Sequence, residues 1–184
     1  MQLKLLYEEK RVLLAKVALR EGELERRGNE NKAGLEIEKY LSTFRDAFNK
    51  IDRTAKYSDK TIGFDWCCAF VYYCCLQAGF SFPVKPTESH RSTLGVVRVW
   101  YDWANLPENQ FYHAANGVSA KPAPGDIVLF DRLLENVDLD HIGVVVGIEP
   151  EGIATAEGNF RNKTGIFYRP FDEHINGYIR LSRF

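Results

Sequence analysis

The residues best suited to chemistry begin with a pair of adjacent cysteines. Cys67 and Cys68 follow Trp66 in the stretch DWCCAFV (residues 65–71), which we expect to open an apolar helix. A thiol in a first helical turn feels the partial positive charge of the helix N-terminus, which favours the thiolate. A thiolate attacks carbonyl carbon, so the stretch predicts a cysteine nucleophile. Helix position alone does not choose between the two thiols, because both lie in the first turn.

A nucleophilic cysteine needs a base that accepts its proton and then protonates the leaving group. It also needs a third group that orients this base. Among four histidines, His141 opens the apolar run HIGVVVG (residues 141–147), where a polar ring would not be chosen for packing. The other three, His90, His113 and His174, lie in predicted loops or a polar turn. We expect those three to be solvated surface residues.

Candidates for the third group lie on the strand that follows His141. Alternation places His141 and Gly143 on one face of their strand, and Glu157 and Asn159 on one face of the next. A turn over residues 149–151 sets Gly143 opposite Glu157 and His141 opposite Asn159, whereas a two-residue turn shifts the register by one. An acceptor on one imidazole nitrogen frees the other nitrogen for the thiol. Alternatively, Glu157 and Asn159 only end a strand, and spacing alone leaves both possibilities open.

The cysteines are predicted to be free thiols. Residues seven apart in a helix are separated by a rise of roughly 10 Å, beyond the Cα separation of about 4.4–6.8 Å that a disulfide allows. No Cys-x-x-Cys spacing suggests zinc, and the acidic residues before His141 do not follow a calcium-loop pattern. We therefore predict no metal and no cofactor. The cysteines are Cys67, Cys68, Cys74 and Cys75, and the acidic residues before His141 are Asp131, Glu135, Asp138 and Asp140.

Helices come first along the chain and strands afterwards, which favours an α+β fold with helices packed on a twisted antiparallel sheet of about five to six strands. Asp65 is the expected N-cap of the cysteine helix, and Gly79 its C-terminal residue. Residues 1–11 are expected to be an N-terminal helical extension of a domain spanning residues 12–184. The other expected helices are 2–27, with a stripe of Leu6, Leu13, Val17 and Leu24; one containing Ile37, Leu41, Phe44 and Phe48; and 94–104. The expected strands are 126–130, 141–149, 152–159, 165–170 and 177–181.

Composition excludes several classes of partner. The formal net charge is −1, and no cluster of lysine and arginine suggests nucleic acid. No apolar run reaches about 18 residues, so we expect no membrane span. The N-terminus becomes charged too early for a signal peptide, so we expect synthesis in the cytoplasm.

Four motifs in order resemble a known family. DWCCAFV (residues 65–71), PGDIVLF (124–130), HIGVV (141–145) and EGN (157–159) are similar to the CHAP domain, the cysteine, histidine-dependent amidohydrolases/peptidases. The resemblance covers roughly residues 12–182 and implies a papain-like α+β fold. It makes Cys67 the nucleophile, His141 the general base, Glu157 the third residue and Asn159 a further polar member. It also implies that the backbone N–H of Cys67 forms part of an oxyanion hole.

The resemblance implies a peptidoglycan hydrolase, either an N-acetylmuramoyl-L-alanine amidase or a stem-peptide endopeptidase, that works through a thioester. A phage lysis enzyme, or an antibacterial effector with an immunity protein as partner, would reach the cell wall by a non-classical route. A cytoplasmic amidase or peptidase acting on a small peptide conjugate is one alternative, and a catalytically silent binding module is another. Trp66, Trp100 and Trp103 are candidate substrate-binding residues, with core packing as the alternative.

Overall fold

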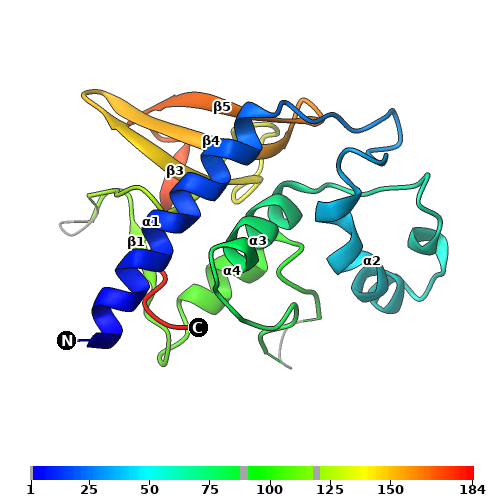
Figure 1. Ribbon diagram of the computed structural model, residues 1–184, viewed down its shortest axis with the longest axis horizontal. Coiled ribbons are helices and arrows are strands. Elements are labelled where there is room, and N and C mark those ends of the chain that lie inside the picture. The colour runs from blue at the N-terminus through cyan, green and yellow to red at the C-terminus, as the bar shows by residue number, and fades with distance from the viewer. Residues whose placement is uncertain (1, 88–90, 118–120) are drawn as a thin grey trace.

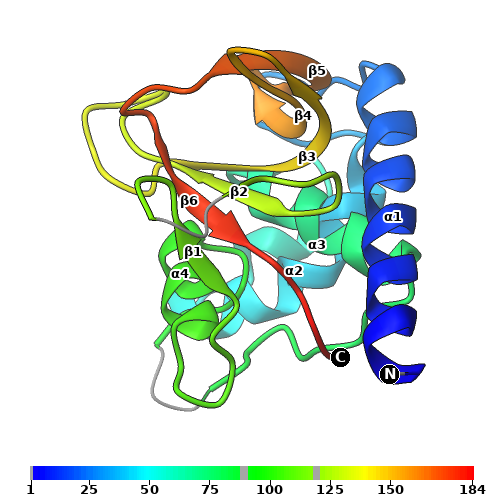
Figure 2. The ribbon, with the colours of Figure 1, turned by 90° about the vertical axis from the view of Figure 1, so that its left-hand side faces the viewer.

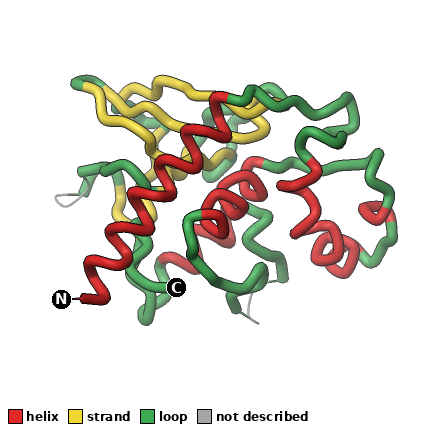
Figure 3. Tube along the Cα trace, in the orientation of Figure 1, coloured by secondary structure: helices red, strands yellow, loops and turns green. Residues whose placement is uncertain are grey.

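The computed structural model describes residues 2–87, 91–117 and 121–184, and it confirms the α+β fold class (Figures 1 and 3). The helices are α1 (Gln2–Glu23), α2 (Glu38–Asp52), the short 3-10 helix η1 (Lys56–Ser58), α3 (Cys67–Gln77) and α4 (Val97–Ala104). The strands are β1 (Tyr112–Ala114), β2 (Ile127–Phe130), β3 (His141–Glu149), β4 (Gly152–Phe160), β5 (Lys163–Pro170) and β6 (Ile175–Ile179).

All six strands form one antiparallel sheet in the order β1-β6-β2-β3-β4-β5. The five predicted strands are confirmed, with boundaries that differ by a few residues at most. Strand β1 was not predicted, because Tyr112–Ala114 is too short to show alternation. Figure 2 shows β6, near the C-terminus of the chain, lying inside the sheet between β1 and β2.

Helix α3 is buried on nearly every side because its sequence, CCAFVYYCCLQ, is almost wholly apolar. It packs against β3 and β4 on one side and against α1 and α2 on the others. Gly79, at φ +84°, ends the helix as predicted. The N–H of Gly79 donates to the carbonyl of Leu76 and that of Phe80 to the carbonyl of Cys75, the double hydrogen bond of a Schellman motif.

The N-cap prediction for α3 is wrong. Trp66 occupies the N-cap position, and no side chain caps the helix there. The carboxylate of Asp65 instead forms an ion pair with Lys32 and accepts a hydrogen bond from Asn159 Nδ2 at 2.9 Å. Helix α3 therefore starts without a side-chain N-cap, which suits an anion-binding helix start.

The hairpin of β3 and β4 combines the two alternatives left open by the sequence. Its turn is the two-residue kind, since Glu149 pairs with Gly152. A β-bulge between Val145 and Gly147 then shifts the register by one residue. Gly143 consequently lies opposite Glu157, as predicted for the longer turn.

Helix α1 buries a different face from the predicted one. Leu14, Ala15 and Ala18 pack inward, whereas Leu6 and Leu13 of the predicted stripe are exposed. Small alanines allow the helix to approach the sheet closely. At Gly125 an added Cβ would lie 2.1 Å from the carbonyl oxygen of Arg11. The helix runs without a break across residue 11, and a separate unit at residues 1–11 stays a prediction.

The remaining predicted helices are confirmed as α2 and α4. The apolar positions Ile37, Leu41 and Phe44 are fully buried, and Phe48 packs at the edge of the same core. Helix α2 continues to Asp52, one turn beyond Phe48. These two helices complete the main core between the helices and the sheet, and a smaller apolar cluster lies on the other face of the sheet.

Candidate active site

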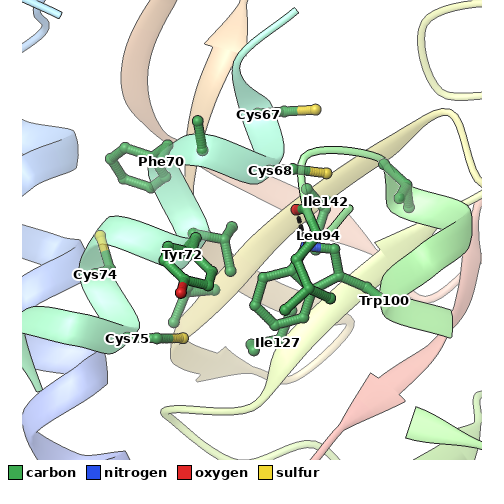
Figure 4. Close-up of a cluster of buried hydrophobic side chains, with 14 of the residues drawn as sticks. Cys67, Cys68, Phe70, Tyr72, Cys74, Cys75, Leu94, Trp100, Ile127 and Ile142 are labelled. Atoms are coloured by element: carbon green, nitrogen blue, oxygen red, sulfur yellow. Dashed lines mark hydrogen bonds between the residues drawn. The ribbon is translucent and has the colours of Figure 1, made fainter. Parts of the chain in front are cut away.

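The two ends of the site come from the start of α3 and the start of β3. Cys67 is the first residue of α3 and retains 7% of its surface in contact with solvent. Figure 4 shows Cys67 and Cys68 at one end of the helix, with Cys74 and Cys75 farther along it among core side chains. His141 is the first residue of β3 and is fully buried.

His141 is held by Glu157 across the β3–β4 pair. Nε2 of His141 lies 2.9 Å from Oε2 of Glu157, and both side chains are fully buried. Gly143 makes room for this contact, because a Cβ there would lie 2.8 Å from Cγ of Glu157. The ring of Phe130 stacks on the imidazole with centroids 6.0 Å apart. The imidazole is therefore fixed in both position and orientation.

The second imidazole nitrogen is available for proton transfer. Nδ1 of His141 is buried, and the described residues offer it no hydrogen bond. Each of Cys67 and His141 shifts the pKa of the other, which indicates that the thiol and the imidazole interact. Nε2 is thus held by a carboxylate, and Nδ1 is left free to exchange a proton with Cys67, the arrangement that a cysteine nucleophile needs.

A salt bridge that the sequence analysis missed completes the site. Arg169 of β5 donates to both oxygens of Glu157, from Nε at 2.8 Å and from Nη2 at 2.7 Å. Thr155 Oγ1 donates to Oε1 of the same carboxylate at 2.6 Å. The available signal was alternation on β5, since Arg169 and Gly165 share the face of Glu157, and Gly165 lies directly opposite it.

The electrostatics favour a thiolate and an imidazolium. A hydrogen bond from the Cys68 thiol is the largest cause that lowers the pKa of Cys67; burial opposes it, His141 adds to it, and the pKa falls to about 5. Burial lowers the pKa of His141, but Cys67 and Glu157 outweigh burial and raise the pKa to about 10. Burial likewise opposes ionisation of Glu157, yet His141 and Arg169 hold its pKa at about 2. At neutral pH the negative charges of Cys67 and Glu157 are therefore balanced by the positive charges of His141 and Arg169.

The other cysteines differ from Cys67. Burial, together with the neighbouring Cys67, raises the pKa of Cys68. Burial also raises the pKa of Cys74 and Cys75, which lie in the core as neutral thiols. All four cysteines are free, as predicted. Geometry and charge therefore favour Cys67 over Cys68 as the reactive thiol, with Cys68 as a neutral hydrogen-bond donor beside it.

Asn159 is brought near the site but not to the predicted partner. It adopts a positive φ of 62° at the irregular end of β4, so regular pairing with His141 does not form. Its amide binds Asp65 instead. Burial raises the pKa of Asp65, and the hydrogen bonds from Lys32 and Asn159 reverse this effect and lower it. The predicted contact between Asn159 and His141 is therefore replaced by a bridge from β4 to the segment that precedes Cys67.

The tryptophans belong to the core. Trp66 and Trp100 are fully buried and Trp103 nearly so. Trp66 stacks on Tyr40 at 5.7 Å, and the indole of Trp100 donates to the carbonyl of Leu94 at 2.7 Å. We assign all three to core packing, the alternative that the sequence analysis gave beside substrate contact. Among the other histidines, His174 is half-buried against Asp131, and His90 lies outside the described residues.

The acidic residues before His141 support the β2–β3 connection. Asp140 accepts hydrogen bonds from the N–H groups of Leu133, Leu134 and Glu135, and Asp131 accepts one from Leu139. Within residues 2–87, 91–117 and 121–184, no group of three or more histidine, cysteine or acidic side chains could hold a metal ion. The acidic residues therefore order the loop from which His141 emerges.

A cysteine at the start of a buried helix and a histidine at the start of an antiparallel strand define a papain-like α+β protein. The CHAP domain family matches residues 59–159, more than half of the chain, and the chain belongs to this family. The family is hydrolytic, of the amidase or peptidase type. Neither a curated relative nor a solved structure was found to match. In the part of the chain that the structure describes, no helix is long and apolar enough to cross a membrane.

Proposed function

We propose that the protein is a cysteine amidohydrolase that cleaves an amide bond of peptidoglycan, either between muramic acid and L-alanine or within the stem peptide. The observation that carries this proposal is the buried array in which Glu157 holds His141 beside a Cys67 thiol of lowered pKa. A silent binding module would not need to keep these groups ionised in the protein interior, where each charge is costly to bury.

The proposed reaction has two steps. The thiolate of Cys67 attacks the amide carbonyl, and the imidazolium of His141 gives its proton to the leaving amine, so that a thioester forms. His141 then takes a proton from water, the resulting hydroxide attacks the thioester, and Cys67 leaves as thiolate. Glu157 stabilises the imidazolium throughout without taking its proton. In this proposal the N–H of Cys67, at the uncapped start of α3, stabilises the oxyanion.

The choice of peptidoglycan rests on membership of the CHAP family. Purified protein incubated with sacculi should release new amines without new reducing sugars, and mass spectrometry of the soluble products should identify the bond. Cys67→Ala should abolish release, while Cys68→Ala should retain release at a reduced rate, because Cys68 donates to the nucleophile but does not attack the substrate. The opposite pattern of these two variants would contradict the assignment of the nucleophile.

The same experiment separates the second candidate function, an amidase or peptidase that acts on a small peptide conjugate. Intact sacculi together with cleavage of small peptide amides would support that function instead. Delivery to the cell wall by a non-classical route, and an immunity protein that covers the site, stay predictions. Co-purification of a specific inhibitor protein with the Cys67→Ala variant would support the prediction of an immunity protein.

A further inference from the structure

The outer face of α1 is unusually apolar for a surface helix. Five large apolar side chains on it are exposed: Leu5 by 57%, Leu6 by 44%, Val12 by 52%, Leu13 by 44% and Leu19 by 37%. Figure 2 shows α1 lying along one side of the molecule, so this face points away from the sheet. A hollow in the face is lined by Leu5, Glu8, Glu9, Val12, Leu13 and Lys16. Exposed apolar patches of this kind mark interaction surfaces.

The exposed residues follow a seven-residue repeat. Leu5, Val12 and Leu19 form one ridge along the helix, and Leu6 and Leu13 form a second. Seven residues correspond to nearly two helical turns, so each ridge drifts by only about 20° per repeat. Glu9 and Lys16 are also seven residues apart, and at about 100° per residue they project between the two ridges.

The first ridge and the charged pair are symmetric about nearly the same point. The ridge is centred on Val12, and the charged pair is centred midway between Val12 and Leu13. Half a residue of helix is less than about 1 Å of rise, so the two centres coincide for practical purposes. A two-fold axis through this point, perpendicular to the helix, would bring Leu5 of one copy next to Leu19 of the other.

We propose that this face binds α1 of a second copy of the chain, antiparallel to it. In that arrangement Leu5 packs against Leu19 of the second copy, and Val12 and Leu13 pack near the axis. Glu9 of each copy meets Lys16 of the other, which forms two equivalent ion pairs. Within the described residues, neither Glu9 nor Lys16 has an ion pair or a side-chain hydrogen bond, so both are free for this role. An isologous interface requires this self-complementarity.

Charge exchange tests the proposal sharply. Sedimentation velocity from about 1 to about 200 μM should show the wild-type chain passing from monomer to dimer. Glu9→Lys alone, or Lys16→Glu alone, places like charges opposite each other twice and should raise the dimer dissociation constant about tenfold. The double variant Glu9→Lys/Lys16→Glu restores both pairs and should restore dimerisation. A monomeric wild type, or a double variant no better than either single variant, would overturn the proposal.

Apolar variants provide the matched comparison. Leu13→Glu places a charge near the axis and should abolish the dimer, whereas Leu35→Glu, at a residue 96% exposed and outside α1, should leave it unchanged. Circular dichroism should show that every variant is folded. A dimer that survives Leu13→Glu would show that another surface forms it and would overturn the proposal. Because the readout is the oligomeric state, the result does not depend on the proposed enzymatic activity.

Discussion

At the scale of single residues, Arg169 balances a buried site that would otherwise carry a net negative charge. Without it, Cys67 and Glu157 would be two buried anions facing one imidazolium. Such a site gains a proton more readily, and the pKa of Cys67 should rise. Arg169 lies outside the segment that the CHAP family matches, so its role comes from the geometry of β4 and β5.

We expect Arg169→Met to lower kcat/KM by at least about tenfold and to destabilise the fold by about 3–5 kcal/mol, because the buried carboxylate of Glu157 loses its bidentate cationic partner and keeps only His141 and Thr155. Arg169→Lys keeps the charge but loses the bidentate contact, so its activity should fall between that of Arg169→Met and that of the wild type. Activity assays and urea unfolding measure these two effects, and iodoacetamide alkylation as a function of pH measures the pKa of Cys67. An unchanged profile in both variants would contradict the role given to Arg169.

The lowered pKa of Cys67 predicts an unusual alkylation profile. The alkylation rate of Cys67 should have its midpoint near pH 5 and level off about two pH units higher, whereas the midpoint of an ordinary thiol lies near pH 8.5. His141→Ala should move the midpoint toward that of an ordinary thiol, because the histidine contributes to the lowering. Peptide mapping identifies the labelled cysteine. Alkylation of Cys68 in place of Cys67 would reverse the assignment.

The sequence drew attention to the cysteine pair, His141 and Glu157, but it missed Arg169, which acts through Glu157. The Cys67-Cys68 pair opens an apolar helix and His141 opens an apolar strand, so their positions drew attention, and the family resemblance chose Cys67. Arg169 looks like an ordinary charged residue on an edge strand, and only the folded register brings it to Glu157. The predicted contact between Asn159 and His141 is wrong, because the positive φ of Asn159 turns the backbone away from the regular alternation that the prediction assumed.

At the scale of elements, the site depends on the closeness of β4 to α3. Gly158 lies directly against the helix, and a Cβ there would sit 2.4 Å from Cβ of Phe70 and 2.9 Å from Cζ3 of Trp66. Both contacts are with rigid parts of buried residues. The absence of a side chain at Gly158 therefore lets the neighbouring Glu157 lie within reach of the histidine beside Cys67.

Gly158→Ala should push β4 from α3, destabilise the protein by about 1–3 kcal/mol and lower activity beyond what the loss of folded protein explains. Gly147→Ala is the control, since a Cβ there makes only an ordinary contact, 3.4 Å from Cβ of Ala154. Urea unfolding and activity per folded molecule are the measurements. Equal effects of the two substitutions would contradict this account of the packing.

Elements were predictable where one periodicity dominated. Helix α2 has a single apolar face, and the sequence identified it correctly. Helix α1 carries an apolar row on each side, and periodicity could not show that the row with small alanines packs inward. The β3–β4 register required both a turn and a bulge, and their opposite shifts leave no trace in a pattern of alternating residues.

At the scale of the whole molecule, the charged site makes stability depend on pH. The pKa of Glu157 falls from 4.5 to about 2 on folding, so it contributes on the order of 3 kcal/mol above pH 4.5, lost as pH falls from 4.5 to 2. Between pH 5 and 10, the gain from Cys67 and the loss from His141 run in opposite directions and largely offset each other.

We therefore expect the melting temperature of the wild type to fall more steeply between pH 4.5 and 2 than that of Glu157→Gln. The glutamine variant has no proton to bind at this position, whereas the other carboxylates titrate equally in both proteins. Differential scanning calorimetry across this range measures the difference in slope. Parallel curves would show that Glu157 is not preferentially ionised in the folded protein.

The place of β6 in the sheet has a consequence for how the protein is made. Strand β2, whose four residues are all buried, pairs with β3 on one side and with β6 on the other. Because ribosomes add residues in order, a growing chain that already carries Cys67, His141 and Glu157 still presents β2 as an open apolar edge until residues 175–179 emerge. Open edges invite pairing between chains. Stalled or truncated products should therefore aggregate on synthesis, so active enzyme would come mainly from fully translated chains.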